Sequence, residues 1–267
     1  MTFIHPTAIV EKGAEIAEGA SVGPYCIVGS KVRLGAGVKL IAHVWIGGDT
    51  TVGDNTEISP FAVIGHNPQH KKCMYQPGKL VIGKNNVIRE HATMHPGTPI
   101  DNNVTIVGDN GLFMVGIHVA HDCVVGDNVI MSNNATLAGH VKVGDWAIVG
   151  GLTAVHQFTR IGAHAMVGGM CGITRDIVPY SLIAANALEG INIVGLKRRG
   201  FSLDVINRLR RAVDEIFKGR EGTLSERVEK VAAEYADCDP VMEIVRFMQA
   251  DSKRGFTQPA EQAAQSL

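Results

Sequence analysis

Aliphatic side chains recur at every sixth position over two long stretches of the chain. The first stretch runs from Ile4 to Ile64 and the second from Val107 to Ile173, and glycine commonly follows the aliphatic residue in the first stretch. A period of six fits neither an amphipathic helix nor an alternating strand. It is typical of a hexapeptide β-helix, in which each hexad is one short strand and a turn. The pattern therefore predicts triangular coils of three hexads, with the aliphatic residues inside and about 4.8 Å between coils.

The six-residue period is interrupted twice and then stops. We expect excursion loops near residues 66–81 and 97–106, and long loops that leave a rigid scaffold are usually functional. The period ends after Pro179. The sequence therefore predicts a mainly β fold, with a parallel β-helix over residues 1–185 and a small α-helical domain over residues 186–267.

Signals for helix starts appear in the last third of the chain. Ser202 and Asp239 each precede an apolar pattern with helical spacing, and the stretch TLSE from Thr223 has the form of a capping box. Short polar side chains at these positions can accept hydrogen bonds from the free backbone N–H groups of the first helical turn. Three helices are therefore expected in the helical domain.

Composition and charge narrow the function classes. The 267 residues carry a formal net charge of −1 and a pI of about 6.8, which gives no indication of nucleic acid as a partner. The five cysteines are scattered without a CxxC pair, so neither a disulfide framework nor a cysteine zinc site is indicated. The start of the chain lacks the pattern of a signal peptide, and the apolar runs are too short to span a bilayer. We expect a cytoplasmic protein without stable membrane insertion.

Histidines gather where the coil period brings distant residues together. Residues 18 apart lie one coil apart on the same face, which places His121, Gly139 and Gln157 above one another. His140 and His156 adjoin this series, so we expect a column about 10 Å long. Imidazole is the usual group for proton transfer near neutral pH, and a solvated face has no reason to concentrate it. We interpret the column as a functional site.

Two other interpretations of these residues stay open at this point. His118, His121 and a third histidine could hold zinc between subunits, as in β-helices that resemble gamma-class carbonic anhydrases. The elaborate loops and the helical domain have no role in such a small zinc lyase. The other interpretation is a non-catalytic scaffold that only binds an acidic partner through lysines and arginines of the loops and the helical domain, and the histidine column disfavours it.

Motifs spread over nearly the whole chain resemble one family. They are the stretches IGHNPQ, HVAHDC, NNATLAGHV, GGLTAVHQF, IGAHAMVGG and NIVGLKRRGF. In combination they resemble the UDP-N-acetylglucosamine O-acyltransferases of lipid A biosynthesis. The resemblance implies a left-handed parallel β-helix that forms a homotrimer with active sites between subunits. It also implies transfer of a 3-hydroxyacyl chain from acyl carrier protein to the glucosamine 3-position of a UDP-sugar nucleotide, the first step of lipid A biosynthesis, without a cofactor or bound metal.

The resemblance assigns catalytic roles to three residues of the column. His121 matches the general base, which a sugar hydroxyl needs before it can attack. Asp122 would orient this imidazole, as the acid does in a catalytic triad. Adjacent residues of an extended strand point to opposite faces, so this pairing requires a corner of the coil. The backbone N–H of Gly139 matches the donor that stabilises the oxyanion.

Further residues match substrate-binding positions of the family. Those expected at the acceptor, the diphosphate or the nucleotide are Gln69, His70, Lys72, His118, His140, His156, Gln157, Asn192, Arg198 and Arg199. A guanidinium fork suits a diphosphate well. Met166 and Gly169 match the groove for the acyl chain, where a small residue leaves room for a long chain.

The first excursion loop departs from the family pattern at one position. It reads QHKK from Gln69 to Lys72, and His70 stands where the family usually carries the acidic residue that contacts the acceptor sugar. This change could accompany a 3-amino acceptor, which would give an amide product. His70 could equally make a different hydrogen bond to the same hydroxyl, and the sequence leaves both readings open.

Overall fold

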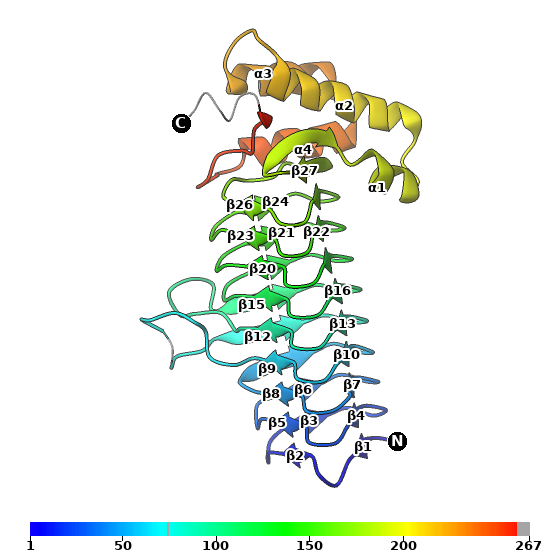
Figure 1. Ribbon diagram of the computed structural model, residues 1–267, viewed down its shortest axis with the longest axis vertical. Coiled ribbons are helices and arrows are strands. Elements are labelled where there is room, and N and C mark those ends of the chain that lie inside the picture. Colours follow the sequence, from blue (N-terminus) through cyan, green and yellow to red (C-terminus); the bar gives the residue numbers. More distant parts are fainter. Residues whose placement is uncertain (74, 261–267) are drawn as a thin grey trace.

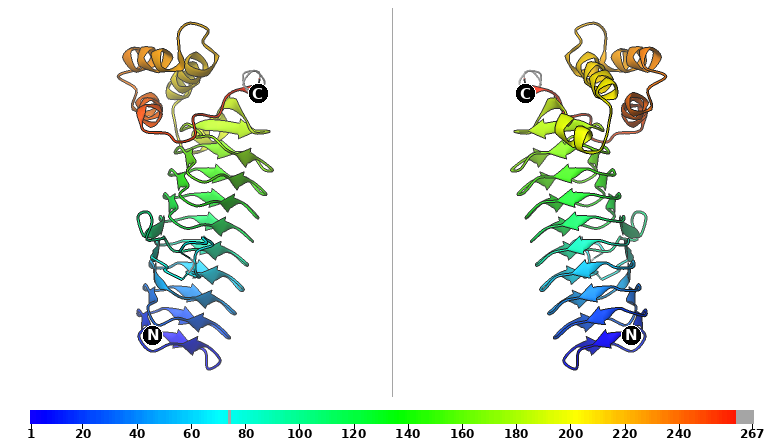
Figure 2. Two further views of the ribbon diagram at one scale, coloured as in Figure 1. Left: turned by 90° about the vertical axis from the view of Figure 1, so that its left-hand side faces the viewer. Right: turned by 90° about the vertical axis from the view of Figure 1, so that its right-hand side faces the viewer.

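Three parallel sheets form the faces of a triangular prism around which the chain winds coil by coil (Figures 1 and 2). The computed structural model describes residues 1–73 and 75–260. Each regular coil adds one strand to each sheet, and strands pair in parallel with their counterparts in the next coil, as Phe3–Ile4 does with Ser21–Val22. The fold is the left-handed parallel β-helix that the resemblance implied.

The strands are short and belong to the three sheets in regular alternation. Sheet A contains β1 (Phe3–Ile4), β4 (Ser21–Val22), β7 (Lys39–Leu40), β10 (Glu57–Ile58), β13 (Val87–Ile88), β16 (Leu112–Phe113), β19 (Ile130–Met131), β22 (Ile148–Val149), β25 (Met166–Val167), β27 (Ser181–Ala184) and β28 (Ala187–Ile191). Sheet B contains β2 (Ile9–Val10), β5 (Ile27–Val28), β8 (Trp45–Ile46), β11 (Val63–Ile64), β14 (Thr93–Met94), β17 (His118–Val119), β20 (Thr136–Leu137), β23 (Ala154–Val155) and β26 (Gly172–Ile173). Sheet C contains β3 (Glu15–Ile16), β6 (Arg33–Leu34), β9 (Asp49–Val52), β12 (Lys79–Ile82), β15 (Val104–Val107), β18 (Val124–Val125), β21 (Lys142–Val143) and β24 (Arg160–Ile161).

The core of the prism contains the apolar residues that recur every six positions, together with small or aliphatic residues two positions before many of them. Val119, Leu137 and Val155 come from successive coils of sheet B, and each is 2% exposed or less. Burial of such a side chain stabilises the fold by roughly 1.5–3 kcal/mol. Ile4 is 46% exposed, because the first coil has a neighbour on one side only. The predicted inward series is confirmed from the second coil onward.

Corners between the faces depend on residues in the left-handed region of backbone space. We call the corner from sheet A to sheet B the AB corner, and name the BC and CA corners in the same way. Asn55, Asn85 and Asn110 occupy the CA corner with φ between +55° and +58°. Asparagine tolerates this conformation better than most residues. The Asn85 amide also donates to Asn110 Oδ1 over 3.1 Å, so the corner forms a ladder parallel to the axis.

The two excursion loops lie close to their predicted positions on neighbouring coils (Figure 1). The first loop ends where β12 begins at Lys79, and the second ends where β15 begins at Val104, so each predicted loop end was three residues too late. The predicted domain boundary after residue 185 falls inside a hairpin. There β28 pairs antiparallel with β27 and extends sheet A to Ile191, which moves the boundary past that residue.

The helices pack on the C-terminal end of the prism as α1 (Ile193–Arg198), α2 (Leu203–Lys218), α3 (Leu224–Glu234) and α4 (Asp239–Gln249). Ser202 caps α2, and Thr223 forms the predicted capping box with Glu226. The cap predicted at Asp239 was one position late, because Cys238 is the N-cap of α4. Among the described helices, none combines the length and apolar character needed to cross a bilayer.

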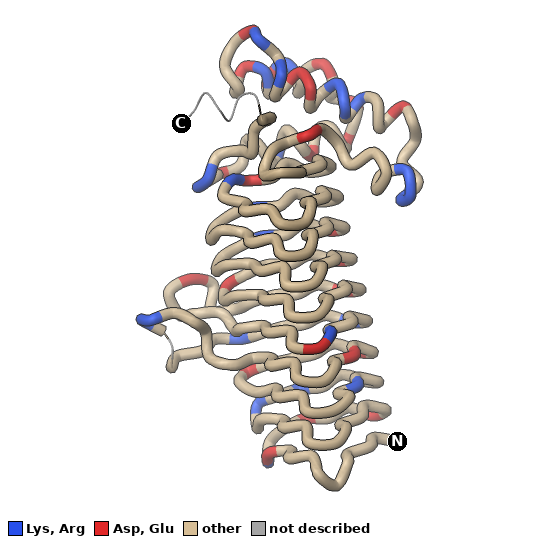
Figure 3. The backbone as a smooth tube through the Cα atoms, in the orientation of Figure 1, with Lys and Arg blue, Asp and Glu red and all other residues tan. Residues whose placement is uncertain are grey.

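Charged residues are distributed unevenly along the prism axis. Figure 3 shows interspersed basic and acidic residues on the helices, whereas the coils are largely uncharged apart from scattered positions and the first excursion loop.

The segment that follows the last helix is attached to the prism by a buried carboxylate. Asp176 accepts from Arg160 Nε at 2.7 Å and from the Ser252 hydroxyl at 2.8 Å. This buried carboxylate ties the C-terminal segment to the last coils.

Candidate active site

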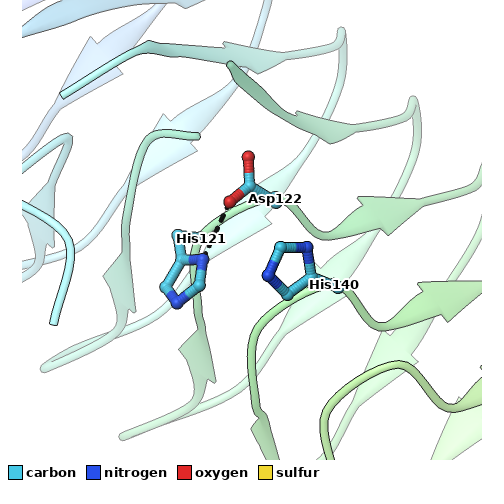
Figure 4. Close-up of side chains that lie close together, drawn as sticks. All are labelled: His121, Asp122 and His140. Atoms are coloured by element: carbon cyan, nitrogen blue, oxygen red, sulfur yellow. Dashed lines mark hydrogen bonds and ion pairs between the residues drawn. The ribbon is translucent and has the colours of Figure 1, made fainter. Parts of the chain in front are cut away.

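His121 and Asp122 form a hydrogen-bonded pair at the BC corner. They lie between β17 and β18, and Asp122 has a φ of +60°, which turns the backbone so that both side chains can meet. His121 Nδ1 is 2.8 Å from Asp122 Oδ2, and both residues are buried (Figure 4). The corner that the pairing requires is thus present.

The Asp122 carboxylate is held by the second excursion loop. The Thr98 backbone N–H donates to Oδ1 over 2.9 Å, and the Thr98 hydroxyl donates to Oδ2 over 2.6 Å. The backbone N–H of Asp122 donates in turn to the Thr105 hydroxyl. Because an ionised carboxylate only accepts, Nδ1 of His121 must carry the proton, which leaves Nε2 as the acceptor nitrogen of the neutral ring. Nε2 has no hydrogen-bond partner among the described residues, so it is available as a base.

Gly139 lies directly against the His121 ring in the next coil. A Cβ atom at this position would be 2.6 Å from Cε1 and 2.8 Å from Nε2 of His121. Any side chain here would therefore displace the imidazole. The Gly139 N–H forms no hydrogen bond within the described part of the chain, whereas its carbonyl accepts from Phe158. A free donor thus lies beside a free base.

His140 occupies the same corner position as Asp122, one coil further on. Its φ is +63°, and its N–H donates to the His121 carbonyl over 3.0 Å. The imidazole stands edge-on to the His121 ring, with 5.1 Å between centroids, and stacks on Phe158 at 4.4 Å. Figure 4 shows the His140 ring beside the pair. The predicted column therefore runs along a corner rather than a flat face.

More imidazoles surround this corner from the neighbouring strands and loop. His118 lies 2.7 Å from the Thr93 hydroxyl, and its ring contacts that of His95 edge-on at 4.9 Å. Burial lowers the pKa of His95 to about 4, and burial with the nearby His121 lowers the pKa of His118. His70 stands edge-on to His121 at 5.3 Å, and its buried Nδ1 has no partner among the described residues. The lowered pKa values favour the neutral form of His95 and His118 beside His121.

Other residues predicted for the acceptor lie at the margin of the corner. His156 is exposed, and the one side-chain hydrogen bond of its imidazole in the described structure is to the carbonyl of Gln157, which also accepts from Arg254. Gln69 and Lys72 are exposed on the first excursion loop. These side chains are free to move toward a substrate.

The residues predicted for the nucleotide lie at a different corner. Asn192 caps α1 and donates to the His164 carbonyl, while Arg199 donates to the Trp146 carbonyl and lies 5.4 Å above the indole ring. Trp146 and His164 belong to the CA corner, on the far side of sheet C from His121. Arg198 is exposed next to this cluster. A single chain therefore does not bring the predicted nucleotide residues to the predicted base.

Met166 and Gly169 lie on yet another part of the prism. Met166 is a strand residue of sheet A, and Gly169 follows at the AB corner, where a Cβ atom would be 3.1 Å from the Gly151 carbonyl oxygen. The side chains of Leu152 and Met170 at this corner are 61% and 80% exposed. The two residues predicted for the acyl groove thus border an exposed apolar edge.

Sequence reasoning missed His95, Thr98 and Asp101, which contact residues of the site. His95 follows an inward-facing methionine. The loop inserted after it changes the residue spacing, so the 18-residue rule no longer relates His95 to residues of later coils. Thr98 and Asp101 belong to the loop itself, where the six-residue period gives no information. No local signal distinguishes them from other polar loop residues.

A metal would compete with existing hydrogen bonds at this corner. His121, Asp122 and His140 each offer a ligand atom within 4.8 Å of the others. The Asp122 carboxylate, however, already accepts from Thr98 and His121. This geometry fits a carboxylate that orients an imidazole.

Comparisons with known proteins point in the same direction. The family model described as "Udp N-acetylglucosamine O-acyltransferase; Domain 2" matches residues 176–257. A Caulobacter vibrioides protein named acyl-[acyl-carrier-protein]--UDP-N-acetylglucosamine O-acyltransferase is 48% identical, over 96% of this chain and 98% of its own length. A Rickettsia rickettsii protein of the same name is 54% identical, over 95% of this chain and 96% of its own length.

Solved structures agree with this similarity. The UDP-N-acetylglucosamine acyltransferase of Francisella novicida aligns with a TM-score of 0.90 and 34% identity, covering 98% of this chain and 96% of that one. The corresponding Campylobacter jejuni structure aligns with a TM-score of 0.88 and 37% identity, covering 96% and 99%.

Proposed function

The chain belongs to the UDP-N-acetylglucosamine O-acyltransferase family, and from this premise we propose that its BC corner is the catalytic centre of that reaction. The enzyme transfers a 3-hydroxyacyl chain from acyl carrier protein to the glucosamine 3-position of UDP-N-acetylglucosamine, the first step of lipid A biosynthesis. The names of the relatives specify O-acyl transfer, so the amide-forming and zinc-lyase alternatives are not favoured.

One observation carries the assignment of the base: His121 has Nδ1 hydrogen-bonded to a fixed carboxylate and Nε2 without a partner among the described residues. In the proposed first step, Nε2 takes the proton of the acceptor hydroxyl as its oxygen attacks the thioester carbonyl. Asp122 stabilises the imidazolium that forms and does not itself take the proton.

The second step uses the free donor beside the base. Attack on the thioester creates a tetrahedral intermediate with a negative oxygen, and the Gly139 N–H is the proposed donor to that oxygen. The intermediate then collapses, the carbon–sulfur bond breaks, and the imidazolium of His121 returns its proton to the departing thiolate. The products are an ester of the sugar and the free thiol of acyl carrier protein, so the base is regenerated.

We assign substrate contacts to the residues that surround this centre. His118, His140, His156 and Gln157 would contact the sugar or diphosphate, and the loop residues Gln69, His70 and Lys72 would approach the acceptor from the other side. Asn192, Arg198 and Arg199 would bind the nucleotide end, and Met166 and Gly169 would border the acyl chain. Each of these assignments rests on the family resemblance together with the placement described above.

A homotrimer is part of the proposal because it would complete the site. The base lies at the BC corner and the nucleotide residues at the CA corner of the same chain. Threefold packing of prisms can bring the BC corner of one subunit against the CA corner of the next, and a closed ring pairs both of these corners in every subunit. A cytoplasmic location also belongs to the proposal, because the reaction needs acyl carrier protein and a sugar nucleotide together.

The test is the mass of the product from purified protein, 3-hydroxyacyl carrier proteins of several chain lengths and UDP-N-acetylglucosamine, measured in parallel without and with a metal chelator. We expect an ester product that needs neither cofactor nor metal. His121→Ala should lower its rate at least about 100-fold, whereas the matched control His91→Ala, at the AB corner, should retain activity. Absence of product from the unaltered protein would sink the proposed function, and loss of product on chelation alone would reinstate a metal.

A further inference from the structure

The second excursion loop supports both imidazoles of the BC corner, one through Asp122 and one directly, by residues three positions apart. Thr98 holds Asp122, which in turn holds His121. Asp101 Oδ2 lies 2.5 Å from His140 Nδ1 and forms a second carboxylate–imidazole pair. The loop is therefore a common support for two neighbouring rings rather than for the base alone.

Packing leaves one property of the His140 ring undetermined. The ring stacks on Phe158 with 13° between planes and meets the His121 ring edge-on at 88°, so its plane is fixed. Such contacts are nearly unchanged if the ring turns over by 180°, which exchanges the positions of its nitrogen and carbon atoms. Only a hydrogen bond distinguishes the two orientations, and Asp101 supplies the one that the structure contains at Nδ1.

We propose that Asp101 is a positioning residue for acyl transfer. Its carboxylate holds the His140 ring in a single orientation and tautomer, with the proton on Nδ1 and Nε2 as the acceptor on the other side. In the proposed function His140 contacts the sugar or diphosphate, and a ring turned over by 180° would present a C–H instead of Nε2 to that substrate. The inference rests on the proposed function for its catalytic consequence, but the ring orientation is a property that can be measured without turnover.

Asp101 is well suited to a test because it contributes little to the core. It is an exposed loop residue, whereas the side chain of His140 is 12% exposed. Its removal should therefore change the ring without unfolding the coil. The adjacent Asn102 is exposed on the same loop, and its side chain forms no hydrogen bond with any described residue. It provides a matched control.

The kinetic experiment compares Asp101→Ala, Asp101→Glu and Asn102→Ala in the full-length enzyme. We expect Asp101→Ala to lower kcat about tenfold, with KM for UDP-N-acetylglucosamine within about twofold and an unchanged Tm. Asp101→Glu should restore at least half of the loss, because a carboxylate can again reach Nδ1. Unaltered kcat in Asp101→Ala, or a loss matched by Asn102→Ala, would overturn the proposal.

A spectroscopic readout separates this inference from the proposed function. The ¹⁵N chemical shifts of histidine-labelled protein report the tautomer, and His140→Gln identifies the signal of His140. We expect the Nδ1–H tautomer in the unaltered protein and a mixture of tautomers in Asp101→Ala. If the tautomer responds but the unaltered enzyme makes no product, the proposed function fails and the positioning of the ring stands. A tautomer that ignores Asp101 overturns the inference.

Discussion

If one active site is built from two subunits, two inactive variants should restore activity to each other. One variant is His121→Ala, which removes the base at the BC corner. The other is Arg198→Ala/Arg199→Ala, which removes the cations near the CA corner. In a trimer with shared sites, each site takes its base from one chain and its nucleotide residues from the next. A mixed trimer then contains one site made from the two unaltered halves.

The size of the recovery follows from counting. Random assembly of equal amounts of the two chains gives mixed trimers in about three quarters of cases, and each has about one intact site in three. We therefore expect about one quarter of the wild-type rate from the unfractionated co-expressed variants, about one third from mixed trimers isolated through two different affinity tags, and almost none from either variant alone. The assay is ester formation by mass spectrometry.

The controls make the result decisive. The two variants purified separately and mixed briefly should stay inactive, since intact trimers exchange subunits slowly. A co-expressed sample that contains mixed trimers but remains inactive would refute the shared site, because a site within one chain would be damaged in every subunit. The same outcome would contradict the proposal that the BC corner of one subunit meets the CA corner of the next.

Three further predictions address the corner, the acyl edge and acid stability. Gly139→Ala should lower kcat about 100-fold with little change in Tm, because the new Cβ atom would enter the space of the His121 ring. Steady-state kinetics measure this effect, and full activity would contradict the contact between Gly139 and His121. Gly169→Met should shift the preferred donor to shorter acyl chains. The preference is measured from product masses when donors of several chain lengths compete, and an unchanged preference would contradict the proposal that Gly169 borders the acyl chain. His95 has a folded-state pKa of about 4 against about 6.5 when unfolded, so the unfolded chain binds its proton first as the pH falls and stability decreases between these values. The unaltered protein should lose on the order of 3 kcal/mol of unfolding free energy over that pH window, and His95→Asn should not show this loss when both are measured by urea unfolding. Identical pH dependence in the two proteins would contradict the burial argument.

The parts of the fold that depend on local periodicity were predictable from the sequence. Val119 and Leu137 are inward-facing because the aliphatic position that recurs every six residues is buried in every coil after the first. The same periodicity brings His121 and Gly139 to neighbouring coils, so the heart of the site was predictable as well. Where the chain leaves the period, as in the hairpin that ends at Ile191, the predicted boundary was wrong.

Two features of the site were beyond the reach of the sequence, for different reasons. Whether His121 and Asp122 can meet depends on a left-handed backbone angle at Asp122, and residue type alone does not determine this. The contacts of Thr98 and Asp101 depend on how a loop without a repeat folds back on the prism. By contrast, Trp146 and His164 lie 18 residues apart, so their shared corner was visible in principle but was not recognised.

The coil-by-coil pairing of strands also governs how this molecule comes apart. Each coil contacts only its immediate neighbours, so its resistance to opening depends on what lies above and below it, as in other linear arrays. The first coil has one neighbour and an uncovered Ile4, whereas the last coils lie beneath the helices. Amide hydrogen exchange should therefore be fastest at the first coil and slow both in the central coils and in the last coils under the helices. The catalytic corner lies in the slowly exchanging middle, which allows one end of the protein to fray without loosening the residues that perform the chemistry.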